Sequence, residues 1–244
     1  MSDKLRFKRA VLKLSGEVLQ GESGYGISPE VMESLAAQLV EVARAGLQVT
    51  VVVGGGNIFR GLAASRMGMD RVDADYMGMM ATVINGLALK DALRARGASA
   101  QLFSALDIEA VGEPFNRDRA IKHLEQGGIN IAVAGTGRPF FTTDTAAALR
   151  ALETDADVLL KATRVDGVYD RDPEQDAEAV RFDHLSYMDA LNKNLRVMDL
   201  AATSLCRDNE LPIIVFDIKK SGNLKKVIKG EYVGTLINGG DSHD

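Results

Sequence analysis

Cysteine is almost absent from this chain, whose 244 residues include only Cys206. A single cysteine excludes a disulfide framework or a cysteine-based metal site within one chain. Cys206 lies in a helical pattern from Asp199 to Asn209, where we expect a small buried hydrophobe. Aromatic residues make up only 5%, but 46% of the residues are apolar and 26% are charged, as in ordinary soluble globular proteins. We therefore expect residues 1–244 to form a single domain with a substantial core.

Long hydrophobic runs are also missing, and none approaches the roughly 20 apolar residues of a membrane span. Residues 1–18 mix charges into a short apolar stretch, unlike a signal peptide, which predicts a cytoplasmic protein with no membrane partner. The net charge is −5, and basic residues do not form a block longer than a pair. Nothing in this pattern favours a nucleic-acid partner.

Apolar runs of strand length alternate with helical patterns along most of the chain. Strands are expected at residues 8–14, 47–53, 99–105, 130–135, 156–162 and 212–218. Helices are expected from Ser28 and Pro29 to Gly46, and at about 73–96, 118–126, 144–152, 199–209 and 223–229. Because the strands are continuously apolar, they indicate a parallel sheet covered on both faces. The predicted fold class is α/β: a three-layer α/β/α sandwich around a mostly parallel central sheet.

Four of the expected strands are followed by unusual residues, at 13–17, 54–61, 134–147 and 159–173. Ligands of such sheets lie beyond the carboxyl ends of the strands. In the second segment, Gly54–Gly56 would let backbone N–H groups converge on a phosphate, and Arg60 would reach the same anion. Alternatively, the glycines make a tight turn and Arg60 is a solvated surface residue. Taken alone, this motif leaves both interpretations open.

Familiar nucleotide motifs and catalytic histidines do not occur in these segments. The chain has no G-x-x-x-x-G-K-[ST] sequence, and "GTGRPF" has Phe140 where a dinucleotide fingerprint has its last glycine, so a P-loop kinase and a dehydrogenase are both disfavoured. The three histidines, His123, His184 and His243, lie elsewhere and are expected to be structural or on the surface. A phosphate monoester needs no general base to attack, because it is already largely dianionic at neutral pH.

Two lysines end buried strands, Lys13 in the first segment and Lys161 in the last. An ammonium group at such a strand end can neutralise a transferred phosphoryl group. Either lysine alone can equally extend from the strand end into water. Two of them at two strand ends favour the functional interpretation.

Five segments together, "KLSGE", "GGGNIFRG", "AGTGRPFFTTDTAA", "LKATRVDGVYDRDP" and "VMDLAA", resemble the bacterial uridylate kinase (UMP kinase) family. They occur in that family's order and spacing along nearly the whole chain. The resemblance implies an amino-acid kinase (carbamate kinase-like) fold and reversible, ATP-dependent phosphorylation of UMP to UDP in pyrimidine nucleotide biosynthesis. Transfer would be direct and in line, with Mg²⁺ carried by ATP rather than held in a protein metal site. The N-terminal part would bind UMP, and the part from about residue 155 would bind ATP.

The resemblance also implies roles for individual residues. Catalysis is assigned to Lys13, Asp144 and Lys161, with Asp144 organising the two lysines. ATP binding is assigned to Lys13, Leu14, Ser15, Gly16, Gly56, Arg60, Thr163, Tyr169 and Asp172. UMP binding is assigned to Gly55, Asp75, Thr136, Gly137, Arg138, Pro139, Phe140, Phe141, Thr142 and Thr143. Arg138 stands where the family often has asparagine, which puts that one contact in doubt.

Regulation and assembly follow only from the resemblance, which implies a homohexamer activated by GTP and inhibited by UTP. The loop matching the GTP-linked region consists of Gly21, Glu22, Ser23, Gly24, Tyr25 and Gly26. By itself it is a flexible glycine loop.

Two rival functions stay open at this point. One is phosphorylation of a carboxylate on the same fold, although Asp75 would repel such a substrate. The other is a nucleotide-binding regulator that has lost catalysis, which the intact Lys13, Asp144 and Lys161 disfavour.

Overall fold

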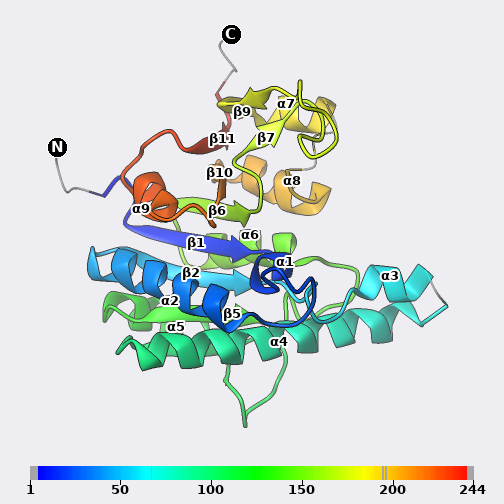
Figure 1. The fold of residues 1–244 in the computed structure, drawn as a ribbon. Coiled ribbons are helices and arrows are strands. Elements are labelled where there is room, and N and C mark those ends of the chain that lie inside the picture. Colours follow the sequence, from blue (N-terminus) through cyan, green and yellow to red (C-terminus); the bar gives the residue numbers. More distant parts are fainter. Residues whose placement is uncertain (1–4, 67, 194, 196, 241–244) are drawn as a thin grey trace.

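The computed structural model describes residues 5–66, 68–193, 195 and 197–240, and a nine-stranded sheet runs through them (Figure 1). The strands lie in the order β4-β3-β5-β2-β1-β6-β10-β11-β9, and only the β10–β11 pairing is antiparallel. Their bounds are β1 Arg9–Leu14, β2 Gln48–Val53, β3 Ala100–Ser104, β4 Glu113–Pro114, β5 Ile129–Val133, β6 Val158–Thr163, β9 His184–Ser186, β10 Ile213–Asp217 and β11 Gly234–Asn238. A separate antiparallel pair joins β7 Val168–Tyr169 to β8 Arg181–Phe182.

Helices connect most of the strands. Their bounds are α1 Gly16–Leu19, α2 Pro29–Arg44, α3 Gly61–Arg66, α4 Arg71–Ala95, α5 Arg117–Glu125, α6 Thr143–Glu153, α7 Tyr187–Asn192, α8 Leu200–Asp208 and α9 Asn223–Ile228. The predicted start of α2 is confirmed, because the Ser28 hydroxyl accepts a hydrogen bond from the Val31 N–H at 3.3 Å. α4 begins two residues earlier than predicted, because Asp70 caps it by accepting from the N–H groups of Val72 and Asp73.

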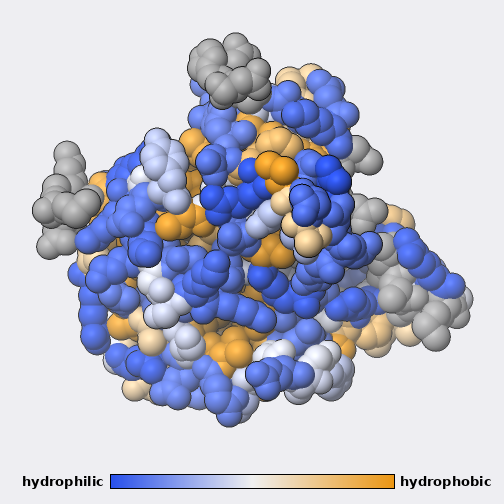
Figure 2. Space-filling model, turned by 45° about the horizontal axis from the view of Figure 1, so that its top comes forward, coloured by the Kyte–Doolittle hydropathy of each residue, from blue (hydrophilic) through white to orange (hydrophobic). Residues whose placement is uncertain are grey.

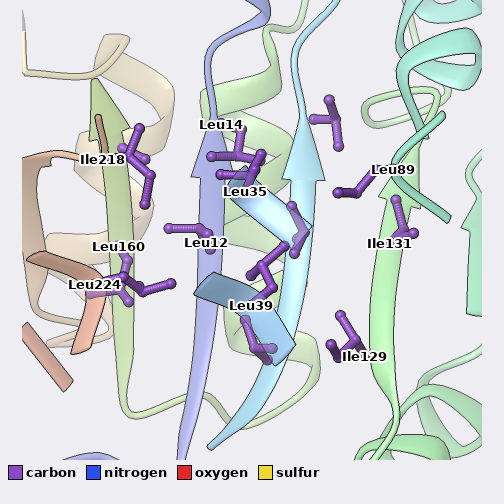
Figure 3. Close-up of a cluster of buried hydrophobic side chains, with 14 of the residues drawn as sticks. Leu12, Leu14, Leu35, Leu39, Leu89, Ile129, Ile131, Leu160, Ile218 and Leu224 are labelled. Atoms are coloured by element: carbon purple, nitrogen blue, oxygen red, sulfur yellow. The ribbon is translucent and has the colours of Figure 1, made fainter. Parts of the chain in front are cut away.

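The two faces of the sheet are buried by different helices, which confirms the predicted α/β class with a mostly parallel central sheet. Successive residues of β1 point to opposite faces. Leu12 and Leu14 belong to a core cluster that includes residues of α2, α4 and α9. Val11 belongs to a second cluster with residues of α6, α7 and α8. Figure 3 shows the first cluster, in which Leu35 and Leu39 of α2 lie over leucines of β1.

The sequence pattern misses α3, α7 and β11, which have six, six and five residues, and five elements that are shorter still. α1, β4, β7, β8 and β9 have two to four residues each, too few to show a periodic pattern. Cys206 is fully buried in α8, as expected. Within the described ranges, no helix combines the length and apolarity needed to cross a membrane. The face shown in Figure 2 is mostly hydrophilic, and its apolar residues lie in small separate patches.

The core leucine of β1 provides a test of the packing. Leu12 is fully buried between β1's neighbours and the α2 layer. Leu12→Ala should lower the free energy of unfolding by about 2–5 kcal/mol, because it removes buried apolar surface and leaves a cavity. Leu200→Ala is the control. Its side chain is 71% exposed, so the loss in free energy of unfolding should be much smaller. Urea denaturation measures both, and equal losses would contradict this account of the core.

Candidate active site

The pairing of β1 with β6 sets two lysines side by side. The two strands are parallel neighbours, and Lys13 is directly opposite Lys161 in their register. Side chains at directly paired positions point to the same face of a sheet. Lys13 alternates with Leu12 and Leu14, so both lysines lie on the face that α6 covers. β1 and β2 point toward the same side of the molecule, where α1 begins (Figure 1).

Asp144 lies between the two ammonium groups. It is in the first turn of α6, whose start is fixed by the Thr142 hydroxyl, which accepts from the Asp144 N–H at 3.0 Å. One carboxylate oxygen lies 2.8 Å from Lys13 Nζ and the other 3.1 Å from Lys161 Nζ. The structure thus brings together the three residues assigned to catalysis. A single carboxylate offsets the repulsion between two adjacent cations.

Burial and charge compete in this cluster. Burial alone would raise the pKa of Asp144, but the ammonium groups of Lys13 and Lys161 outweigh it and hold that pKa below its ordinary value. Burial lowers the pKa of Lys161, and the Asp144 carboxylate opposes the shift. The arrangement therefore favours an ionised Asp144, and burial makes Lys161 easier to deprotonate than an exposed lysine.

The segment before α8 adds contacts that sequence reasoning missed. Lys161 Nζ donates to the Val197 carbonyl. Asp199 caps α8 by accepting from the Ala202 N–H at 2.8 Å, and it also accepts from the hydroxyls of Thr142 and Thr145. Asp199 therefore ties the start of α8 to the start of α6, which carries Asp144. Asp199 belongs to the quoted segment "VMDLAA", but no pattern within that segment predicted which residues Asp199 would contact.

The three-glycine turn after β2 has two different physical causes. A Cβ at Gly54 would lie 2.8 Å from the Gly16 nitrogen, and a Cβ at Gly55 would lie 2.8 Å from the Gly78 carbonyl oxygen on α4. These two positions need glycine because the chain packs against itself. A Cβ at Gly56 would meet nothing within 4 Å, so packing does not explain the glycine at that position. Packing, as in the tight-turn interpretation, therefore explains Gly54 and Gly55, and the phosphate interpretation stays a prediction.

Arg60 lies close to the turn, but an acidic residue holds it. Its guanidinium donates to the Gly56 carbonyl at 3.2 Å and pairs with Glu17 at 2.6 Å. The other oxygen of Glu17 lies 3.5 Å from Arg164. Glu17 belongs to the quoted "KLSGE" segment, yet sequence reasoning gave it no role.

Two cavities meet at the end of β1. One, of about 600 Å³, lies on the β6–β7 side and is lined by five of the residues assigned to ATP: Lys13, Ser15, Thr163, Tyr169 and Asp172. The other, of about 450 Å³, includes Gly16, Gly55, Gly56, Arg60 and Thr143. Lys13, Ser15 and Glu17 line both. The fully buried side chain of Leu14 lines neither of them.

Most residues assigned to UMP lie outside these two cavities, in the loop before α6. The loop is joined to α4, because the Phe140 N–H donates to Asp75 at 2.7 Å. Arg71 donates to the same oxygen at 2.8 Å and lies over the Phe140 ring. Phe140 has a φ of 70° and is 65% exposed, as is typical of backbone held by its surroundings at a functional loop. The remaining loop residues are Thr136, Gly137, Arg138, Pro139, Phe141 and Thr142, and Arg138 is exposed.

Other predicted residues have structural partners of their own. Tyr169 donates to Asp166 at 2.5 Å, and Asp172 accepts from the Glu174 N–H at 2.9 Å within a turn. His123 and His184 hydrogen-bond to asparagines far from the lysine cluster along the strands, and His243 lies outside the described residues. Within the described ranges, no cluster of three or more His, Cys, Asp or Glu side chains is arranged to hold a metal ion.

A family model matches most of the chain. The model of the amino acid kinase family matches residues 8–217, and the chain belongs to that family.

Solved structures narrow the likeness to particular proteins. The chain is similar to the UMP kinase of Bacillus anthracis, with 39% identity, a TM-score of 0.91 and coverage of 95% of this chain and 96% of that one. The UMP kinase of Ureaplasma parvum is 38% identical, with a TM-score of 0.89 and coverage of 96% and 100%. The uridylate kinase of Archaeoglobus fulgidus is 33% identical, with a TM-score of 0.72 and coverage of 93% and 99%.

The lysine cluster predicts a pH-dependent contribution to stability. The folded-state pKa of Asp144 lies below its ordinary value of 3.8, so its stabilisation is fully present above that value and is lost as pH falls through the folded-state pKa. Asp144→Asn should lower the free energy of unfolding by about 3–5 kcal/mol at neutral pH, because it leaves two buried cations without the carboxylate between them.

Urea denaturation of the wild type and Asp144→Asn from pH 7 downward measures this difference. The difference in free energy of unfolding between the two proteins should narrow below pH 3.8, because Asp144 of the wild type then becomes protonated. Asp208→Asn, which removes an exposed partner of Arg207, is the control and should shift stability by at most about 1 kcal/mol. A difference in free energy of unfolding that stays constant with pH would contradict an ionised Asp144 between the two lysines.

Proposed function

We propose that this protein is a UMP kinase, which transfers the γ-phosphoryl group of ATP directly and in line to UMP and so forms ADP and UDP. The observation that carries the proposal is the Lys13–Asp144–Lys161 cluster at the junction of two cavities. The similarity to structures of UMP kinases, at 38–39% identity over nearly the whole chain, supports it.

The chemistry of the site suits transfer between two phosphates. Donor and acceptor are both anionic, so the protein must supply cations and a fixed geometry rather than a base. Lys13 lines both cavities, and its ammonium group would lie between donor and acceptor. Lys161 would neutralise the transferred group from the donor side. Asp144 would hold both ammonium groups in place and stay outside the reacting bond.

The two parts of the chain would divide the substrates between them. We assign ATP to the cavity beside β6 and β7, in the part from about residue 155, and UMP to the N-terminal part. Asp75 would accept from the ribose hydroxyls of UMP, exchanging its present donors, Arg71 and the Phe140 N–H, for them. A carboxylate substrate would be repelled by Asp75, which disfavours the rival carboxylate kinase.

Mg²⁺ would arrive with ATP and neutralise phosphate charge. Asp144 is already engaged by two lysines, so it fits an organising role better than that of a metal ligand. A place in pyrimidine nucleotide biosynthesis, a cytoplasmic location, activation by GTP at the Gly21–Gly26 loop and inhibition by UTP belong to the same proposal. The cytoplasmic location is supported by the charges among residues 1–18, and the other three are supported by the family resemblance alone.

Substrate specificity tests the proposed reaction directly. ADP formation from MgATP would be measured with UMP, CMP, dTMP, acetylglutamate and aspartate, each offered separately. We expect turnover with UMP alone. Lys13→Ala should lower kcat by roughly 100-fold or more, because it removes a cation from the transferred group.

Lys122→Ala, at an exposed lysine of α5, is the matched control and should retain full activity. Turnover with acetylglutamate or aspartate would favour the carboxylate kinase instead. Binding of ATP or UMP without any turnover would favour the regulator.

The assembly proposed with this function is a homo-oligomer, in the family a hexamer. α4 carries a stripe of exposed apolar side chains at helical spacing: Val72, Tyr76, Met77, Met80, Ile84 and Leu87. Met79, at the edge of this stripe, is buried in the core. Contiguous exposed apolar side chains of this kind mark an interaction surface. We assign the stripe to contact with a second copy of the chain.

Charges on the stripe would separate the copies. Met80→Asp combined with Ile84→Asp should reduce the molar mass measured by light scattering after size-exclusion chromatography. Tyr232→Asp, at an apolar side chain that is 84% exposed outside α4, should leave the mass unchanged. An unchanged mass in the α4 variant, or a monomeric wild type, would contradict the assignment.

A further inference from the structure

Two buried carboxamides lie beneath the three-glycine turn, and neither was singled out by any sequence pattern. Asn57 directly follows the turn, and Asn85 projects from the middle of α4. Asn57 is 2% exposed and Asn85 is fully buried. Burying a carboxamide is costly unless its hydrogen-bonding groups are satisfied, so a buried pair beside a binding turn needs an explanation.

The two side chains bond to each other reciprocally. Asn57 Nδ2 donates to Asn85 Oδ1 at 3.0 Å, and Asn85 Nδ2 donates to Asn57 Oδ1 at 2.7 Å. The second hydrogen of each amide is also used: Asn85 donates to the Gly54 carbonyl and Asn57 to the Gly26 carbonyl, both at 2.7 Å. Because two backbone carbonyls accept from the two NH₂ groups, neither amide can be turned over without setting oxygen against oxygen.

The pair thereby joins three segments. Asn85 fixes the first residue of the turn to α4, the helix that also carries Asp75. Asn57 fixes the end of the turn to the Gly21–Gly26 loop, and its carbonyl also accepts from the Gly26 N–H at 2.8 Å. Glycines have no side chains with which to pack, so the shape of a glycine turn depends on the bonds made by its backbone.

We propose that Asn57 and Asn85 are positioning residues, which hold the Gly54–Gly56 turn in the shape that accepts phosphate. The proposal rests on the proposed function for its kinetic readout only. The turn is pressed against α4 at Gly55 and faces open space at Gly56, so a shift at Gly54 would move the ligand-facing backbone directly. The same pair links the Gly21–Gly26 loop to that backbone, so a change in the loop's conformation would also reach the phosphate site.

Asn130 provides a matched control. It is another buried asparagine, 1% exposed, and its side chain donates to the Ala120 carbonyl at 2.9 Å and bonds to His123 at 2.7 Å. It lies near the start of β5, at the opposite end of the sheet from the turn. Asn85→Leu and Asn130→Leu each remove a satisfied buried amide of the same size. A merely structural role predicts that both lose stability and that neither changes the ligand affinity of the folded protein.

The experiment measures three quantities for each variant: the thermal unfolding temperature, the affinity for inorganic pyrophosphate by calorimetry, and kcat and KM for UMP and MgATP. In Asn85→Leu we expect pyrophosphate affinity and both kcat/KM values to fall by roughly 10- to 100-fold, because small displacements of positioned groups are costly. In Asn130→Leu they should stay within about twofold at a comparable loss of thermal stability.

A double variant separates positioning from stability. Asn57→Leu with Asn85→Leu should recover part of the lost stability, because the two amides no longer leave each other unpaired. Its pyrophosphate affinity should stay low, because the Gly54 and Gly26 carbonyls still lack their donors. If Asn85→Leu does not fold, Asn85→Asp keeps the size and the acceptor, loses the donor to Gly54 and should show the same loss.

The possible failures are distinguishable. A wild type that binds pyrophosphate but does not phosphorylate UMP would contradict the proposed function, while the calorimetric comparison would still test the asparagine pair. Equal pyrophosphate affinities in Asn85→Leu and Asn130→Leu, or a wild type without pyrophosphate affinity, would overturn the positioning role.

Discussion

The site depends on one electrostatic arrangement, in which two lysines that the sheet forces together share one carboxylate. The β1–β6 register sets Lys13 opposite Lys161, and their repulsion would oppose folding if nothing lay between them. α6 supplies Asp144 from its first turn, within 2.8 Å of one ammonium group and 3.1 Å of the other. The register, the start of α6 and the ionisation of Asp144 are therefore linked.

The surrounding structure serves mainly to hold that arrangement. The start of α6 is fixed twice, by Thr142 at its own N-terminus and by Asp199 at the start of α8. On the other side of Lys13, the glycine turn after β2 is held against α4, where Gly55 leaves no room for a side chain. Strands thus place the cations, and helix starts and turns place the groups around them. This division explains why the site lies at the carboxyl ends of the strands.

Much of this architecture could be predicted from the sequence, because it is encoded locally. Continuous apolar strands and capped helices predicted the α/β class, and the helix starts near Ser28 and Asp144 were close to those observed. Lys13 and Lys161 stood out because each is a charged residue near the end of a buried apolar strand. The partners that sequence reasoning missed, Glu17, Asn85 and Asp199, act across elements far apart in the chain. Glycine gives no sign of its neighbours either, so packing at Gly55 and open space at Gly56 could not be distinguished from the sequence.

The central claim is that the two cavities meeting at Lys13 hold the donor and the acceptor of one phosphoryl transfer. The most direct test is a crystal structure of the protein with UMP and a non-hydrolysable ATP analogue. The account predicts the analogue's triphosphate in the cavity beside β6 and β7, the UMP phosphate in the second cavity beside Gly55, and Lys13 Nζ within hydrogen-bonding distance of both. Phosphates bound away from Lys13, or both nucleotides in one cavity, would contradict it.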